Sequence, residues 1–303
     1  NGFAGQFSLG QAGFMAVGAY VVGVFTVPVE LRPNVFYAEP MNPMIADIQL
    51  PLWLALLFGG LLAALIAFLI GWPVLRLRGD YLAIATLGFS EIIRILITNA
   101  QSWTNGALGI KDIPALNDVR YIFVATAITF LFVTCLINSS YGRAFKAIRE
   151  DEIAAEAMGV GLFKHKCMAF MLSAFFAGIG GGLYATLLGT VDPKNFLFTL
   201  TYNFLLIIVL GGMGSITGSM LGSIIVTGGL EYLRVFDEPL ELFGMAIPLF
   251  RPGFRMVMFS VLLMACVLFW RKGIMGTNEF TWDKFIAFCK NPVKYFTQKG
   301  ANQ

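Results

Sequence analysis

Charged residues are scarce in this chain of 303 residues: Asp, Glu, Lys and Arg make up 13% of it, against about 25% in an ordinary soluble protein. A soluble globule of this size needs more charge to cover its surface, and 57% of the residues are hydrophobic. The composition therefore excludes a soluble enzyme, a nucleic-acid-binding protein and a disordered protein. A multi-pass membrane protein remains.

The residues that carry common catalytic and ligand-binding chemistry are also missing. No GxxxxGK[ST] phosphate loop occurs, so the chain is not expected to bind ATP in the usual way. The single histidine, His165, lies in a basic segment, where a solvated loop histidine explains it better than a ligand or a general base. The four cysteines form no CxxC pair and no metal-ligand spacing. We expect no catalytic residue, no metal site and no cofactor in this chain.

Apolar runs are plentiful, and a run of about 20 such residues is long enough to cross the hydrocarbon core as a helix. The sequence predicts an all-α, polytopic integral membrane helical bundle with about eight transmembrane helices. The first run is rich in glycine and is a candidate for a broken or re-entrant span. Because the chain begins with Asn1 rather than Met, we expect one or more leading helices to be missing. The predicted spans are 3–27, 51–75, 81–99, 120–138, 168–190, 196–213, 216–235 and 255–271.

Basic residues gather in the segments that would lie on one side of the membrane. If each run crosses once, 76–80, 139–167 and the tail after 270 share a side, and the positive-inside rule makes that side cytoplasmic. The loops at 28–50, 100–118 and 236–253 would then face outward. The basic residues on the predicted cytoplasmic side are Arg76, Arg78, Arg143, Lys146, Arg149, Lys164, Lys166, Arg271, Lys272, Lys284, Lys290, Lys294 and Lys299.

Two parts are expected along the chain: a transmembrane domain over 1–272, with 139–167 as a cytoplasmic loop, and a cytoplasmic tail over 273–303. An apolar stripe at helical spacing predicts an amphipathic helix in the tail, with its lysines near anionic lipid. A contact helix for a partner subunit is the alternative. The stripe is formed by Trp282, Phe285, Ile286 and Cys289, and the lysines beside it are Lys284 and Lys290.

Glycines recur at four-residue spacing in the apolar runs. Four residues are about one helical turn, so each set lines one helix face and lets another backbone approach. The two alternatives are packing within this chain and packing against a second subunit. The residues are Gly178 and Gly182 in one set, and Gly214, Gly218 and Gly222 in the other.

The segment 139–167 is too polar to span a membrane. Acidic residues at a helix start favour the helix dipole and glycine suits the C-terminal cap, so the segment predicts a short helix of about two turns. Its alanine side chains are small, so this face of the helix is narrow enough to enter a cleft on another protein. The alternative is a surface helix that only joins two spans. The residues of this candidate site are Glu150, Asp151, Glu152, Ala154, Ala155, Gly159 and Gly161.

The stretch GRAFKAIREDEIAAEAMGV in this segment resembles the cytoplasmic coupling segment, or EAA loop, of permeases in ATP-binding-cassette importers. It is most similar to the LivM/LivH permease family of branched-chain amino-acid transporters, in particular the LivM type. Two features depart from the family: Glu152 is offset by one from the stricter EAAxxxG pattern, and the tail lacks a proline after Arg271. Other agreeing stretches are NGFAGQFSLGQAGFMAVGAY at 1–20, LRLRGDYLAIATLGFSEIIR at 75–94, TNGALGI at 104–110, LGGMGSITGSMLG at 210–222 and RKGIMG at 271–276.

The resemblance implies one of two permease subunits of an importer in the bacterial inner membrane, which moves leucine, isoleucine and valine. The implied partners are a second homologous permease subunit, two cytoplasmic ATPase subunits, a periplasmic amino-acid-binding protein and membrane lipid, with no nucleic acid. ATP hydrolysis would belong to the partner subunits, and Glu150 to Gly161 would dock into an ATPase groove and pass its closure to the spans. The alternatives are a permease for urea, short amides or other small carboxylates, and a stand-alone channel or secondary transporter.

Glu91 and Arg94 lie inside the run 81–99, three residues apart and so on one helical face. Charges at membrane depth are costly and usually face protein or a water-filled cavity. One hypothesis is that the two residues line the translocation path and hold a zwitterionic amino acid. The other, which we favour, is a mutual ion pair that locks the helix to a neighbour.

Overall fold

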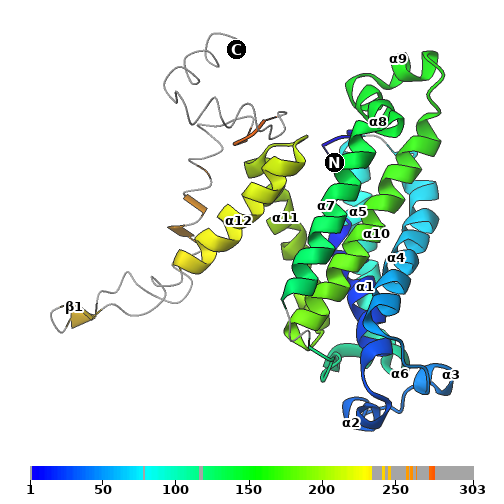
Figure 1. Cartoon of the computed structure of the whole chain (residues 1–303), viewed down its shortest axis with the longest axis vertical. Helices are drawn as coiled ribbons and strands as arrows, with labels where there is room; N and C mark the ends of the chain where they lie inside the picture. Colours follow the sequence, from blue (N-terminus) through cyan, green and yellow to red (C-terminus); the bar gives the residue numbers. More distant parts are fainter. Residues whose placement is uncertain are drawn as a thin grey trace. The chain divides into compact units, whose positions relative to one another are not determined.

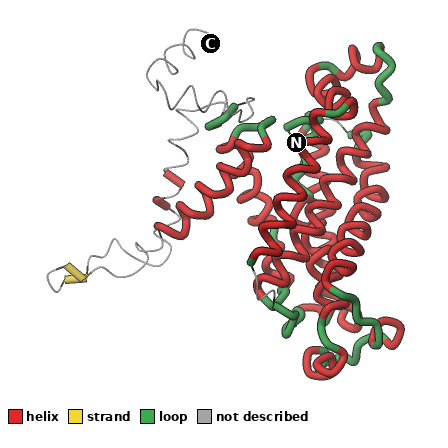
Figure 2. Tube along the Cα trace, viewed as in Figure 1, coloured by secondary structure: helices red, strands yellow, loops and turns green. Residues whose placement is uncertain are grey.

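The computed structural model describes residues 2–77, 79–115 and 119–233, together with 241–242, 245–246, 257–258, 260–261, 264 and 273–276. The chain divides into two compact units, Asn1–Phe204 and Leu205–Gln303. Helices dominate the described residues (Figure 2). The short strands β1 (Glu241–Leu242) and β2 (Met245–Ala246) pair antiparallel. The predicted all-α fold is confirmed.

Long apolar helices build the first unit. Four of them are long and apolar enough to cross a membrane: α4 (Leu52–Val74), α5 (Asp80–Asn99), α7 (Arg120–Asn138) and α10 (Leu162–Leu188). The shorter α1 (Gln11–Thr26) packs against α4, α5 and α10 (Figure 1).

Short helices lie at the two ends of this bundle. The helices α2 (Arg32–Val35), α3 (Pro43–Ala46) and α6 (Gln101–Thr104) gather at one end (Figure 1). The helices α8 (Ser140–Glu150) and α9 (Glu152–Ala157) lie at the opposite end (Figure 1). The described part of this unit also contains three 3-10 turns: η1 (Val29–Leu31), η2 (Gly106–Leu108) and η3 (Pro193–Phe196).

The second unit contains the second half of α11 (Phe198–Gly211) and all of α12 (Ile216–Tyr232). These two helices meet at a bend of 119°. Because neither reaches 18 residues, they qualify as a membrane crossing only as a pair. The backbone N–H of Ile274 donates to the carbonyl oxygen of Leu210 at 2.8 Å, and that of Met275 donates to the carbonyl oxygen of Gly211 at 3.1 Å. These bonds give a hydrogen-bond partner to two carbonyl groups at the C-terminal end of α11.

Several predicted spans coincide with helices, and 120–138 matches α7 at both ends. The count of eight is not confirmed, because the described residues contain four spanning helices, or up to six if each bent pair is one span. The bent pairs are α11 with α12, and α1 with the helical residues 29–35 at an angle of 97°. Most of the run 255–271, and all of the apolar stripe of the predicted tail helix, lie outside the described residues.

Glycines bring α1, α4 and α10 into backbone contact. A Cβ atom on Gly18 of α1 would overlap the carbonyl oxygen of Gly178 on α10, and one on Gly59 of α4 would lie 3.2 Å from the carbonyl oxygen of Gly18. A Cβ atom on Gly182 would lie 2.6 Å from Cγ2 of Val22. The glycine pair of α10 therefore packs within this chain, where the small residues allow close approach.

In the second glycine set, Gly218 and Gly222 lie on α12, but Gly214 does not. A Cβ atom on Gly218 of α12 would overlap the carbonyl oxygen of Gly211, and one on Gly222 would lie 2.6 Å from that of Ile207. Gly214 corrects the prediction of one continuous stripe: it precedes α12, in the turn, with φ +109°. That backbone conformation suits glycine because it has no Cβ atom.

Candidate functional site

The first part of the candidate site is the α8–α9 segment, residues 140–161. Asp151 caps α9: its Oδ1 accepts the backbone N–H groups of Ile153 at 2.8 Å and Ala154 at 3.2 Å. Glu152 is the first helical residue, where a negative charge favours the helix dipole. Glu150, predicted to begin this helix, is instead the last residue of α8.

A glycine closes the other end of α9. Gly159 has φ +83°, and its N–H donates to the carbonyl oxygen of Glu156 at 2.9 Å. The N–H of Val160 donates to the carbonyl oxygen of Ala155 at 3.0 Å. These two bonds form a Schellman motif, which requires a left-handed residue at the position of Gly159. Gly161, with φ −68°, has an ordinary conformation before α10.

One ion pair and one hydrogen bond join this segment to the rest of the first unit. Nζ of Lys166, on the first turns of α10, lies 2.5 Å from Oε1 of Glu152, and only 12% of the lysine side chain is exposed. Arg149 pairs with Glu150, and its Nη1 donates to the carbonyl oxygen of Gly2 at 2.9 Å. A pair with one buried partner is screened by salt less than a fully exposed pair. This pair joins α9 to α10, which packs on α1 and α4.

The exposed face of α9 differs from the predicted alanine face. Ala154 and Ala157 are exposed, but Ala155 is only 4% exposed and faces the protein. Ile153 and Met158, which are 78% and 85% exposed, stand on the outside of the segment. Neither residue was predicted as a contact from the sequence, although two large apolar residues in a segment too polar to span a membrane are a usable signal.

His165 lies on α10 rather than in a loop. Its Nδ1 is 2.8 Å from the carbonyl oxygen of Gly161, and its ring is 6.3 Å from the rings of Tyr141 and Phe145 on α8. The histidine is half-buried, so the prediction of a solvated loop residue is corrected. Among the residues that the structure describes, no group of three or more His, Cys, Asp or Glu could hold a metal ion.

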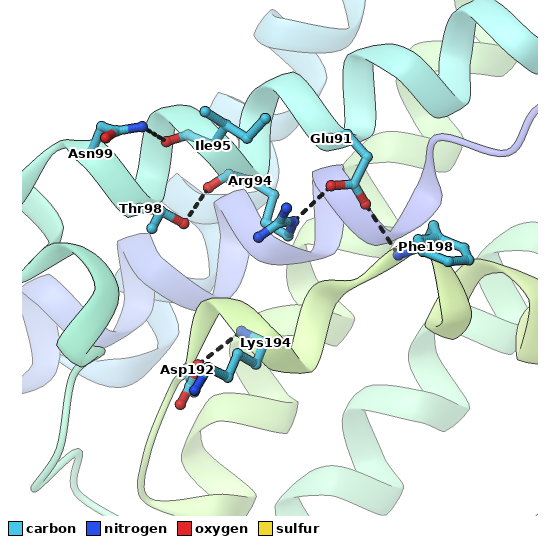
Figure 3. Close-up of polar contacts among 8 residues, drawn as sticks. All are labelled: Glu91, Arg94, Ile95, Thr98, Asn99, Asp192, Lys194 and Phe198. Atoms are coloured by element: carbon cyan, nitrogen blue, oxygen red, sulfur yellow. Dashed lines mark hydrogen bonds and ion pairs between the residues drawn. The ribbon is translucent and has the colours of Figure 1, made fainter.

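The second part of the candidate site is the charged pair on α5 (Figure 3). Nε of Arg94 lies 2.7 Å from Oε2 of Glu91, and the two side chains are 23% and 27% exposed. The other carboxylate oxygen, Oε1, accepts the backbone N–H of Phe198 at 3.2 Å. Phe198 is the first residue of α11. Glu91 therefore joins α5 to the start of another helix, a contact that sequence reasoning missed because a backbone N–H has no side-chain signature.

The first unit contains further polar groups on α1, α5, α11 and the segment before α11. Asp192 and Lys194 lie in the segment that leads to Phe198, where Oδ1 of Asp192 accepts the N–H of Lys194 at 2.8 Å (Figure 3). Hydroxyls that are buried without a hydrogen-bond partner occur on α1, α5 and α11: those of Tyr20, Ser90 and Thr201. Such hydroxyls are rare in native structures and call for an explanation beyond packing.

Arg32 organises the loop at the opposite end of the bundle. The guanidinium is buried and donates to the backbone carbonyl oxygens of Val27 at 3.2 Å, Ile45 at 2.9 Å, Ile48 at 2.7 Å and Ala46. Burial lowers the pKa of Arg32, whereas the nearby Asp47 raises it; an arginine stays charged under either influence. One side chain thus ties α2 and α3 to the end of α1.

Known proteins resemble the chain over most of its length. The family model for the branched-chain amino acid transport system / permease component matches residues 1–267. The chain is 36% identical over 271 residues to the high-affinity branched-chain amino acid transport system permease protein LivM of Escherichia coli, which covers 78% of this chain and 59% of that protein. This chain thus spans less than two thirds of that relative.

Two other relatives show how the family varies. The chain is 26% identical over 201 residues to LivH of Escherichia coli, covering 57% of this chain and 63% of LivH. It is 24% identical over 282 residues to the guanosine ABC transporter permease protein NupQ of Bacillus subtilis, covering 86% of this chain and 81% of NupQ. No solved structure matches the chain significantly.

Proposed function

The chain belongs to the family of permease components of branched-chain amino acid transport systems, and on that premise we propose that it is one of two permease subunits of an ATP-driven importer. Its cargo is leucine, isoleucine and valine. The observation that carries this proposal is the family match over residues 1–267. The chain is a transport subunit, and separate partner subunits hydrolyse ATP.

The α8–α9 segment is the proposed contact with the ATPase subunits. A coupling element must be rigid, because a loose one would absorb the movement of the motor instead of passing it on. The caps at Asp151 and Gly159 and the ion pair between Glu152 and Lys166 supply that rigidity. The exposed side chains of Ile153 and Met158 provide the apolar contact that a groove on an ATPase would bury.

The arrangement of basic residues supports an orientation with this segment in the cytoplasm of a bacterial cell and the chain in its inner membrane. The ring of Trp72, near the end of α4, lies 5.4 Å from that of Phe163 at the start of α10. The predicted cytoplasmic loop after α4 and the α8–α9 segment are therefore at the same end of the first unit. The opposite end, ordered by Arg32, would receive the periplasmic amino-acid-binding protein.

The second permease subunit would be a homologue of this chain. The similarity of the chain to both LivM and LivH supports this, because the two names describe permease proteins of the same kind of transport system. The translocation path would lie beside the polar elements around Glu91, with Arg94 as its cationic partner. Both residues remain predictions as path residues.

Uptake into vesicles tests the proposal. The chain is reconstituted with a second permease, ATPase subunits and an amino-acid-binding protein from the same organism, and radiolabelled leucine is supplied outside. We expect ATP-dependent uptake that excess isoleucine or valine suppresses and that guanosine and urea do not. Uptake of guanosine or urea in place of leucine, or leucine flux without ATP, would contradict the proposal.

A further inference from the structure

A groove with a volume of about 590 Å³ lies on the first unit between α4 and α10. Leu61 and Phe68 of α4 and Phe175 of α10 are among the residues that form its apolar walls. Leu61 and Phe68 are exposed on the outside of the unit. Among the described residues that line the groove, Lys164 alone is charged.

Along α10, the groove is about as long as one leaflet of the hydrocarbon core is thick. Its lining on α10 runs from Phe163 to Phe175, which at about 1.5 Å per residue is a rise of about 18 Å. One half of the hydrocarbon core is about 15 Å deep. Lys164 stands at the end where α10 begins, beside the edge-to-face contact of Trp72 with Phe163. Aromatic residues of this kind gather where the hydrocarbon core meets the headgroups.

The chemistry of the walls argues against another helix as the occupant. Helices in membranes approach each other through small residues, and this chain uses glycines where α1, α4 and α10 meet. The groove is lined mainly by leucine, phenylalanine and methionine, with Ala64 on α4 and Cys167 on α10 as its small residues. Methionine side chains such as Met168 and Met171 adapt to flexible apolar partners. An acyl chain fits these walls better than a helix.

The positive charge of Lys164 at the end of the groove favours a lipid with an anionic headgroup. Lys164 is exposed, and no ion pair to it occurs among the described residues, whereas Lys166 is engaged by Glu152. We propose that this groove binds an anionic phospholipid from the leaflet on the α8–α9 side, with an acyl chain along α4 and α10 and the phosphate on Lys164. Because α9 is tied to α10 at Lys166, two residues further on, the bound lipid would brace the part of α10 that carries the α8–α9 segment.

Native mass spectrometry of the full chain, purified with its partner subunits, tests the headgroup contact. The complex is titrated with phosphatidylglycerol or with phosphatidylcholine of the same acyl chains. We expect about a fivefold preference for phosphatidylglycerol, which equals the ~1 kcal/mol that a basic residue contributes near an anionic surface. Lys164→Gln should abolish the preference. Lys146→Gln removes one positive charge from an exposed position on α8, which lies at the same end of the first unit but outside the groove. This variant should leave the preference for phosphatidylglycerol unchanged.

A second pair of variants tests the acyl-chain contact. Ala64→Phe fills the groove and should reduce retention of phosphatidylglycerol several-fold, whereas Leu65→Phe, on the exposed surface of α4 beside the groove, should not. Equal losses in Lys164→Gln and Lys146→Gln would mean unspecific attraction and overturn the proposal. Loss of a partner subunit from Ala64→Phe with full lipid retention would mean that a protein covers the groove. If Ala64→Phe fails to assemble, the lysine pair decides alone.

Discussion

Glu91 on α5 accepts the backbone N–H of Phe198, the residue that begins α11, at 3.2 Å (Figure 3). A carboxylate at a helix start offsets the partial positive charge of the unsatisfied N–H groups there. The same carboxylate neutralises Arg94 on its own helix at 2.7 Å. One side chain therefore contacts both a cation on its own helix and the start of another helix.

Substitutions at this pair separate its two possible roles. Glu91→Gln keeps an acceptor for Phe198 but leaves the charge of Arg94 without a partner, which should cost roughly 1–3 kcal/mol of stability. If the pair is a lock, Glu91→Gln combined with Arg94→Gln should restore both the melting temperature and leucine uptake. If the pair lines the path, the double variant should regain its melting temperature while uptake stays low. Thermal unfolding and vesicle uptake of the same preparations provide the two readouts.

The ion pair between Lys166 and Glu152 should be required for transmission of movement. Lys166→Gln leaves a carboxylate on α9 that no longer holds α10, so leucine uptake should fall while the ATPase subunits remain bound. The charge-reversed double variant, Lys166→Glu with Glu152→Lys, should recover part of the uptake. Lys111→Gln, at an exposed position outside the α8–α9 segment, is the control for the loss of one positive charge. Wild-type uptake by Lys166→Gln would show that this pair is dispensable.

The two glycines that follow α9 provide an internal control for backbone strain. Gly159 has φ +83° and Gly161 has φ −68°. Gly159→Val should cost about 1–2 kcal/mol, because a side chain disfavours the left-handed conformation, and should open the C-terminal cap. Gly161→Ala should be nearly neutral. Hydrogen exchange of the α9 amides measures the effect, and faster exchange in Gly161→Ala than in Gly159→Val would contradict it.

Substitutions at a buried position and at an exposed position on α9 should have different effects, one on stability and the other on binding of the ATPase subunits. Ala155→Leu forces a larger side chain into the protein, so it should detach α9 and lower stability; overpacking of this kind typically costs about 1–3 kcal/mol. Ile153→Ser should leave stability unchanged and weaken binding of the ATPase subunits. Thermal unfolding and co-purification of those subunits distinguish the two outcomes. Equal binding by Ile153→Ser and the wild type would remove Ile153 from the proposed contact.

Apolar runs and cap residues made much of the fold predictable. A run such as 120–138 must satisfy its backbone internally in lipid, so composition alone predicts a helix there. The caps of α9 were predictable because Asp151 and Gly159 are residue types that suit the two ends of a helix.

Other features depend on tertiary structure and had no sequence signal. Hydropathy predicted the start of the span at 168 but not the start of α10 at Leu162, because the helix continues through basic residues beyond the apolar run. A helix of six residues is too short for periodicity to show that Ala155 faces inward. The bend between α11 and α12 depends on the turn at Gly214, which spacing alone placed on a helix.

The accessibility and cross-linking of position 158 test the coupling role of α9 most directly. Met158 is 85% exposed, so Met158→Cys in a background without the four native cysteines offers one reactive thiol on the segment. We predict that a membrane-impermeant thiol reagent reaches it only from the cytoplasmic side, and that a cross-link from it to an ATPase subunit stops ATP-driven leucine uptake. Labelling from the external side, or undiminished uptake by the cross-linked complex, would contradict the account.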